Sequence, residues 1–335
     1  MTTSVVPLID LAPFLEGTAA GKRAVAAQVG RACEEIGFLK IVGHGVPAAL
    51  VEAMDAHARA FFALPLAEKL RIRRPSKDVS RGYIPIGDES LSYSLGREAP
   101  PDAKEVLALG LEDVPDDDDH RRGPAAFHFA PNLWPARPEG LRDVVIAYYR
   151  AMERLAADLM RVFAIALALP EDFFADKIDR HISGFRLINY PEQPREPVPG
   201  QLRSGEHSDY GSLTILRIED APGGLQVRTP GGAWADVGAV PDGFVVNLGD
   251  LMMHWTNARW VSTLHRVVNP PRDRALGSGR LSFVFFHQPN HDALIECLPT
   301  CQGPDNPPKY PPVTSGEHRL RKFRATSLEP TATPG

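Results

Sequence analysis

Three residues of the 335-residue chain have the types and the spacing of a metal site. His207 and Asp209 stand two positions apart in a segment with strand-like composition, so the spacing predicts that both side chains project from one face of a strand. His265 lies in a second β-branched run further along the chain. Two imidazoles and one carboxylate form a triad that holds Fe(II) and leaves three positions of its octahedron open. These residues predict a non-haem iron site.

The sequence around the first pair favours this interpretation over a chance pairing. With 11 histidines in the chain, roughly one His-x-Asp tripeptide is expected at random, so the tripeptide alone carries no weight. Gly205 and Gly211 flank it, the apolar run 213–216 follows, and the second histidine sits inside another strand-like run. That context favours a metal site built on two strands of a sheet.

Arg280 and Ser282 form a second chemical pattern downstream of the triad. They occupy alternate positions in the run 280–286, whose aromatic and β-branched residues predict a strand, so their side chains share a face. A guanidinium binds a carboxylate through two parallel hydrogen bonds, and a neighbouring hydroxyl adds a third donor. An ion pair between Arg280 and a surface acid is the simpler alternative. The position after the triad favours a clamp for the distal carboxylate of 2-oxoglutarate.

The order of further motifs resembles one known family. The chain is similar to the 2-oxoglutarate- and Fe(II)-dependent dioxygenases of the isopenicillin N synthase-like superfamily. The resemblance rests on the triad, on Arg280-x-Ser282, and on the segments 6–11, 37–46, 81–83, 102–105, 189–191, 248–250 and 256–257. It implies that His207, Asp209 and His265 bind Fe(II), with 2-oxoglutarate and O2 as cosubstrates and ascorbate as a candidate reductant.

The segment Asn189-Tyr190-Pro191 departs from the family pattern, because relatives often carry two aromatic residues there. Either Asn189 or Tyr190 is therefore a candidate contact to 2-oxoglutarate, alongside Arg280 and Ser282. Residues 270–279 also form a longer connection than in many relatives, and they predict a long hairpin loop.

The substrate is the least determined part of the prediction. Tyr83, Trp255 and Phe285 are candidate pocket residues by position and size, with a place in the apolar core as the alternative for each. The sequence contains no pattern that indicates a polymer-binding groove. We therefore expect the substrate to be a small molecule, either amino-acid-derived or a specialised metabolite. Hydroxylation is favoured, while desaturation, ring closure and ring expansion stay open because the fold hosts all of them.

Two other functional classes stay open at this point. One is an iron oxidase of the isopenicillin N synthase or aminocyclopropane carboxylate oxidase kind, which does not use 2-oxoglutarate. The other is a sensor or binding module that has kept the metal without catalysis. The presence of triad and clamp together favours the 2-oxoglutarate-dependent enzyme over both.

Charge and composition exclude several partners. The net charge is −5 and the isoelectric point about 6.1, without a basic stripe, so nucleic acid is not expected as a partner. The chain lacks an apolar run of about 18 residues and a leader-like beginning, and we expect a cytoplasmic protein without membrane insertion. The sequence does not indicate an oligomeric state.

The pattern of apolar residues predicts a mostly β core, a double-stranded β-helix or jelly roll, with flanking α-helices. We expect an N-terminal dioxygenase region (1–130) with helices at 22–36 and 47–64 around a strand at 38–42, and irregular structure over 76–138. A long helix at 143–169 dominates the next part (131–180), the jelly-roll core follows (181–290), and a C-terminal segment and tail (291–335) end the chain.

Residues 315–327 carry several basic side chains and predict a C-terminal helix. Three placements are compatible with it: a solvated helical face, which is favoured, a helix folded over the mouth of the barrel, or a contact with a neighbouring chain. The Pro- and Thr-rich tail after Leu328 is expected to be disordered.

Overall fold

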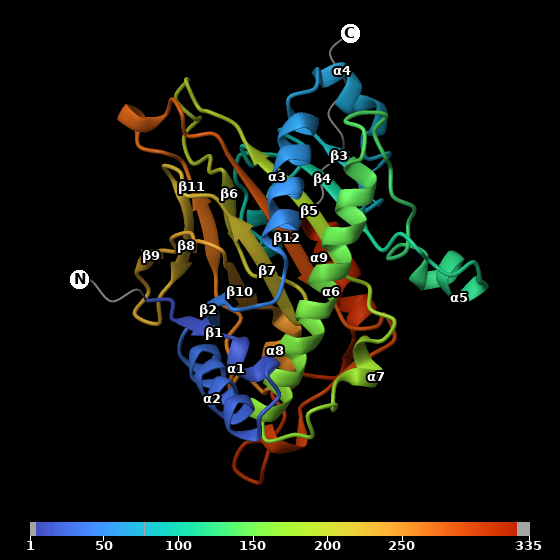
Figure 1. Cartoon of the computed structure of the whole chain (residues 1–335), viewed down its shortest axis with the longest axis vertical. Helices are drawn as coiled ribbons and strands as arrows, with labels where there is room; N and C mark the ends of the chain where they lie inside the picture. Colours follow the sequence, from blue (N-terminus) through green and yellow to red (C-terminus); the bar gives the residue numbers. More distant parts are fainter. Residues whose placement is uncertain (1–4, 77, 327–335) are drawn as a thin grey trace.

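Two β-sheets pack against each other in the computed structural model, which describes residues 5–76 and 78–326 (Figure 1). The larger has eight strands in the order β1 (Leu8–Asp10), β2 (Phe38–Val42), β10 (Phe244–Leu248), β7 (Leu213–Ile218), β12 (Arg280–His287), β5 (Gly184–Tyr190), β4 (Glu105–Gly110) and β3 (Gly82–Ile84). The smaller has the order β6 (Ser204–His207), β11 (His265–Val268), β8 (Gly224–Arg228) and β9 (Trp234–Asp236). A separate pair joins β13 (Leu294–Ile295) to β14 (Val313–Thr314). The architecture is the expected double-stranded β-helix with flanking helices.

Strand β12 shows how the large sheet separates two apolar cores. Its alternate residues Leu281, Phe283 and Phe285 belong to the cluster packed between the sheet and the helices. Val284, one position out of phase, belongs to the second cluster, which includes Val267 from the smaller sheet and therefore lies between the sheets. The period of two along a strand thus assigns each residue to the helix side or to the interior of the barrel.

Helices α2 (Ala19–Glu35), α3 (Ala48–Phe62) and α6 (Leu141–Ala166) cover the outer face of the large sheet (Figure 1). The long helix α6 presents a continuous apolar face to it, with Tyr148 against Phe185 and Phe283. Shorter helices are α1 (Ala12–Leu15), α4 (Leu66–Lys69), α5 (Asp118–Arg121), α7 (Ala175–Ile178), α8 (Asp250–Trp255) and α9 (Ser315–Thr326), with 3-10 turns η1 (Leu70–Ile72), η2 (Leu91–Leu95), η3 (Gly123–Ala125), η4 (Arg272–Arg274) and η5 (Pro299–Cys301). Within the described ranges, no helix is long and apolar enough to cross a membrane.

The three expected helices and the strand at 38–42 are confirmed, with ends shifted by a few residues. The expectation of irregular structure over 76–138 is wrong in part, because β3 and β4 extend the large sheet there through pairing of β4 with β5. The expected hairpin at 270–279 is also wrong. β11 and β12 lie in different sheets, so this segment crosses from one sheet to the other.

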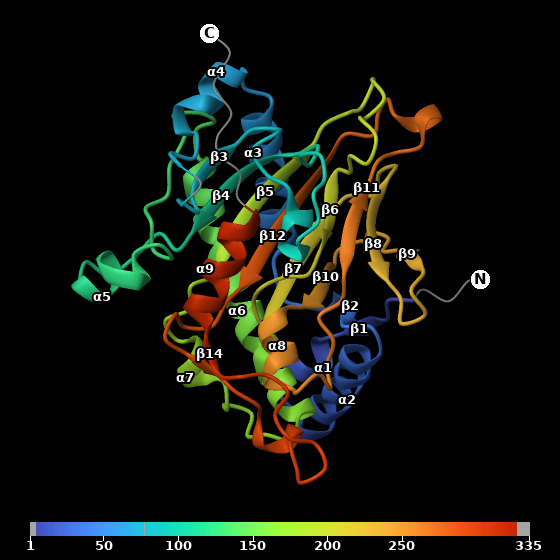
Figure 2. The ribbon, with the colours of Figure 1, turned by 180° about the vertical axis from the view of Figure 1, so that it is seen from behind.

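The C-terminal helix α9 lies across the open end of the barrel, beside η2 (Figure 2). An ion pair of 2.8 Å joins Lys322 to Asp250 at the start of α8, and Arg319 and Phe323 are buried. The favoured interpretation as a solvated helical face is therefore wrong, because one side of α9 is packed against the barrel. The residues after Leu328 lie outside the described part of the chain.

Candidate active site

The two histidines of the triad face each other on neighbouring strands. β6 and β11 are antiparallel, and His207 and His265 are paired in register with ring centroids 4.2 Å apart. Oδ1 of Asp209 lies 3.9 Å from Nε2 of His207 and 3.8 Å from Nε2 of His265. All three side chains are buried, and their ligand atoms lie within 4.8 Å of one another. This spacing suits one metal ion held by all three residues.

Backbone carbonyls fix the orientation of both imidazoles. Nδ1 of His207 donates to the carbonyl of Gly205 at 2.7 Å, and Nδ1 of His265 donates to that of Thr263 at 3.0 Å. The proton on Nδ1 leaves the lone pair of each Nε2 directed toward Asp209 and free to bind a metal. Burial, followed by the neighbouring His265, lowers the pKa of His207 to about 3, so this imidazole is neutral at physiological pH.

Asp209 lies just beyond the end of β6, which stops at His207, so the expected single strand carrying both ligands is shorter than predicted. Its Oδ2 accepts hydrogen bonds from Oγ1 of Thr214 at 2.6 Å and from Nδ2 of Asn247 at 2.7 Å. Thr214 and Asn247 both donate to Oδ2 and not to Oδ1. One carboxylate oxygen is thereby held by the protein, and the other is presented to the metal.

A cavity between the sheets joins the triad to the predicted clamp. Its wall includes the triad together with Arg280, Ser282 and Tyr190. The guanidinium of Arg280 is buried, and among the described residues it donates only a long bond of 3.4 Å, to the carbonyl of Gly223. Its Nε has no partner, and in the described part of the chain no carboxylate forms an ion pair with it. A dicarboxylate placed in this cavity can reach both the metal site and Arg280.

The two candidates on β5 lie on opposite faces of the large sheet. Tyr190 pairs with Arg280 across β5 and β12 and lines the cavity. Asn189 faces the opposite side of the sheet, where its Nδ2 donates to Glu105 at 2.8 Å. Lys104, which the sequence motifs do not assign to the site, also lines the cavity and pairs with Asp102 at 2.8 Å.

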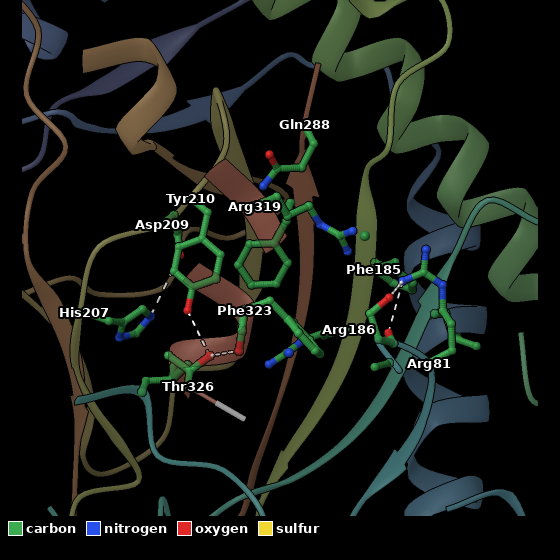
Figure 3. A pocket seen from close by; sticks show the side chains of 16 residues that line it. Arg81, Phe185, Arg186, His207, Asp209, Tyr210, Gln288, Arg319, Phe323 and Thr326 are labelled. Carbon is green, nitrogen blue, oxygen red and sulfur yellow. Dashed lines mark hydrogen bonds and ion pairs between the residues drawn. The ribbon is translucent and has the colours of Figure 1, made fainter. Parts of the chain in front are cut away.

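A second cavity is also lined by residues of the metal site (Figure 3). His207 and Asp209 line both cavities, as do Arg186 and Phe286. Tyr210 and the inner side of α9 complete the wall, with the hydroxyl of Tyr210 donating to Oγ1 of Thr326 at 3.2 Å. The remaining lining residues are Ser80, Arg81, Leu91, Ala108, Leu109, Gly184, Phe185, Gln288, Arg319 and Phe323.

The three aromatic residues expected in a substrate pocket lie elsewhere. Tyr83 hydrogen-bonds to Glu105 and packs in the helix-side core. Trp255 packs against Phe174, and Phe285 is fully buried in the same core. Among the described residues that line the two cavities, none of these three occurs. Their expected role is corrected: they support the sheet and the helices from outside the site.

The residues that do line the second cavity had a signal in the sequence. On β12 the alternation that places Arg280 and Ser282 inside the barrel also places Phe286 there and turns Phe285 outward. Arg319 and Phe323 were not predictable in this way, because their role depends on where α9 docks.

Comparison with known proteins agrees with this geometry. Residues 6–137 match the N-terminal region described as "non-haem dioxygenase in morphine synthesis N-terminal", and residues 182–289 match the 2OG-Fe(II) oxygenase superfamily. The chain belongs to the 2OG-Fe(II) oxygenase superfamily and, within it, to the isopenicillin N synthase-like family. His207, Asp209 and His265 form its Fe(II) triad, and 2-oxoglutarate is the cosubstrate.

Individual relatives resemble it over nearly their whole length. A 2-oxoglutarate-Fe(II) type oxidoreductase, hxnY of Emericella nidulans, is 37% identical over 320 residues, covering 94% of this chain and 88% of the relative. Validamycin A dioxygenase of Streptomyces hygroscopicus is 30% identical over 328 residues, covering 96% and 86%. The crystal structure of a full-length Neurospora crassa protein in complex with α-ketoglutarate and thymine superimposes with a TM-score of 0.84 at 30% identity, covering 97% of this chain and 98% of that one. Of the three functional classes compatible with the sequence, these relatives support the 2-oxoglutarate-Fe(II) type oxidoreductase.

Proposed function

We propose that the protein hydroxylates a small-molecule substrate and couples this reaction to the conversion of 2-oxoglutarate to succinate and CO2. One observation carries the proposal: a single cavity is lined both by the triad and by a buried arginine, Arg280, that has no carboxylate partner among the described residues. An unpaired buried guanidinium is costly, and an anionic ligand removes that cost.

Each part of the chain has a distinct role in this proposal. The triad holds Fe(II), which with 2-oxoglutarate supplies the activation of O2 for attack on a substrate C–H bond. Arg280 and Ser282 bind the distal carboxylate of 2-oxoglutarate, and Tyr190 lies beside them. Burial of the whole cavity keeps water from competing with these hydrogen bonds.

The second cavity is the proposed substrate site. His207 and Asp209 line it from the metal side, so a molecule bound there lies next to the iron. Arg186 and Phe286, which line both cavities, separate the proposed substrate and cosubstrate positions. Helix α9 covers the site, which limits the substrate to a small molecule.

Succinate formation without added substrate tests the cosubstrate assignment. The purified protein is incubated in air with Fe(II), ascorbate and 2-oxoglutarate, because a slow decarboxylation uncoupled from substrate requires no knowledge of the substrate. We expect succinate from the wild type and none from His265→Ala. Arg280→Ala should require at least about 10-fold more 2-oxoglutarate, as for the loss of a charged hydrogen-bonding pair.

A protein that binds iron but forms no succinate and does not bind 2-oxoglutarate under anaerobic conditions would contradict the proposal. Once a substrate is found, the mass of its product tests the reaction type. A gain of one oxygen atom supports hydroxylation, whereas loss of two hydrogen atoms without oxygen identifies desaturation.

A further inference from the structure

Two buried arginines face the second cavity, and neither has an acidic partner in the part of the chain that the structure describes. Arg319 of α9 and Arg81 before β3 both line it (Figure 3). Nη1 of Arg319 donates to Nδ1 of His128 at 2.7 Å, and its other nitrogens make no hydrogen bond to any residue that the structure describes. Arg81 donates to the carbonyl and the hydroxyl of Ser80 and to the carbonyl of His128, and its Nε is buried without a partner among the described residues.

Two glycines of the sheet lie beside these two side chains. Gly110 and Gly184 stand opposite each other on β4 and β5. A Cβ at Gly110 would lie 1.9 Å from Nη2 of Arg81, and one at Gly184 would lie 3.8 Å from Nη2 of Arg319. The absence of a side chain at Gly110 therefore lets Arg81 pack over the sheet, while the Gly184 position is in ordinary van der Waals contact with Arg319.

The charge around the cavity is not balanced. Arg186 forms hydrogen bonds of 2.9 and 3.0 Å to the carboxylate of Glu89, so this arginine is neutralised. In the described ranges neither Arg81 nor Arg319 has such a partner. Burial, followed by the neighbouring charges of Arg81 and Arg186, lowers the pKa of Arg319 to about 9. Two desolvated positive charges beside an empty volume are expensive unless an anion joins them.

His128 does not supply that anion. Burial, followed by the charge of Arg319, lowers the pKa of His128 to about 2, so its imidazole is neutral and only accepts one hydrogen bond. The carboxylate of Asp209 lies in the cavity wall but belongs to the metal. The wall also includes the apolar side chains of Leu91, Phe286 and Phe323, whereas those of Leu109 and Phe185 pack on the helix side of the sheet.

We propose that the second cavity binds a small organic acid, with Arg319 and Arg81 holding its carboxylate and the apolar wall holding its body beside the metal. This inference rests on the proposed function, since it assigns the substrate class of that same site. Figure 3 places Arg81 across the cavity from His207, so a carboxylate held by the arginines leaves the other end of the molecule near the iron. Arg319 is the main ligand, because it has the most unused donors.

Matched pairs of ligands test this proposal. Binding of benzoate, phenylacetate and octanoate is compared by calorimetry with binding of benzamide, phenylacetamide and octanamide. The protein is loaded with Fe(II) and 2-oxoglutarate and kept free of O2, so that binding is separated from turnover. We expect at least one acid to bind at least about 10-fold more tightly than its amide, as for a charge-assisted pair of hydrogen bonds.

Three variants assign the effect to Arg319. Arg319→Met should abolish the preference for the acid, and Arg319→Lys should retain part of it because the charge remains. Arg324→Met is the matched control, since Arg324 lies on the same helix but is exposed; it should bind like the wild type. The melting temperature of ligand-free Arg319→Met should be no lower than that of the wild type, because the substitution removes a buried charge that has no acidic partner among the described residues. If Arg319 were purely structural, its replacement would lower the melting temperature.

Equal binding of acids and amides, or an acid preference that survives in Arg319→Met, would overturn the proposal. If Arg319→Met does not fold, a reduced preference for the acid in Arg319→Lys, with unchanged 2-oxoglutarate binding, supports the proposal. A preference in Arg319→Lys equal to that of the wild type overturns it. Substrate-free succinate formation is recorded in parallel. Succinate formation without a preference for the acid supports the proposed function and contradicts this inference. A preference for the acid that depends on Arg319, in a protein that neither forms succinate nor binds 2-oxoglutarate, supports the acid site and contradicts the proposed function.

Discussion

His207 and His265 are directly opposite each other on β6 and β11, and the register of these two strands sets the distance between the two imidazoles. A shift by one residue would turn one of the rings to the other face of the small sheet. The third ligand, Asp209, depends instead on two hydrogen bonds from neighbouring strands. Strand pairing therefore places two ligands, and side-chain contacts orient the third.

Removing the support of Asp209 should weaken metal binding. Thr214→Val deletes the hydrogen bond to Oδ2 while keeping the size of the side chain. We expect iron affinity to fall by about 10- to 100-fold, as for other residues that orient a metal ligand. Anaerobic iron titration measures the change, with Thr229→Val, at a half-buried threonine of the turn after β8, as the control. Unchanged affinity in Thr214→Val would show that Asn247 alone fixes the carboxylate.

Tyr190 and Asn189 should respond differently to substitution. Tyr190→Phe removes a hydroxyl from the cavity that holds Arg280, and we expect the 2-oxoglutarate concentration at half-maximal succinate formation to rise by about 3- to 10-fold, as for one neutral hydrogen bond. Asn189→Ala is the matched control on the other face of β5, and it should leave that concentration unchanged. The opposite result would place the cosubstrate contact on Asn189.

Substitution of two adjacent residues of β12 should have different effects, one on the stability of the fold and the other on substrate binding. Phe285 is fully buried and packs on Tyr149, so Phe285→Ala should lower the free energy of unfolding by about 3–5 kcal/mol. Phe286 lines both cavities and is half-buried, so Phe286→Ala should change the apparent affinity for substrate acids with a smaller loss of stability. Chemical denaturation and ligand titration of both variants measure the two effects. Equal losses of stability would contradict this assignment.

The sequence was sufficient for the triad and for placing Arg280 and Ser282 on one face inside the barrel, because the residue types of the triad are chemically specific and the two-residue period fixes the faces. The same period excludes Phe285 from the interior once Arg280 is placed there, so this error was avoidable. Choosing between Asn189 and Tyr190 required the register of β5 with β12, which no local pattern contains. The docking of α9 depends on contacts such as Lys322 with Asp250, between segments far apart in the chain.

Acid should destabilise the fold through His128, which is buried between Arg319, His291 and Arg81. Burial is the largest cause of its lowered pKa, about 2 in the folded protein compared with 6.5 ordinarily, and the positive charges around it act in the same direction. The unfolded chain therefore binds a proton below pH 6.5 while the folded chain does not. The stabilising contribution of this neutral imidazole is complete above pH 6.5 and is lost progressively as the pH falls toward 2.

Urea denaturation at pH 7.5 and pH 5.0 measures this contribution. One proton taken up only by the unfolded chain corresponds to a loss of about 2 kcal/mol between these two pH values. Because glutamine does not titrate, His128→Gln should lose about 2 kcal/mol less than the wild type over the same interval, whatever its stability at pH 7.5. Equal losses in the two proteins would mean that the folded chain also protonates His128, and the positive charge of Arg319 would then have to be displaced from it.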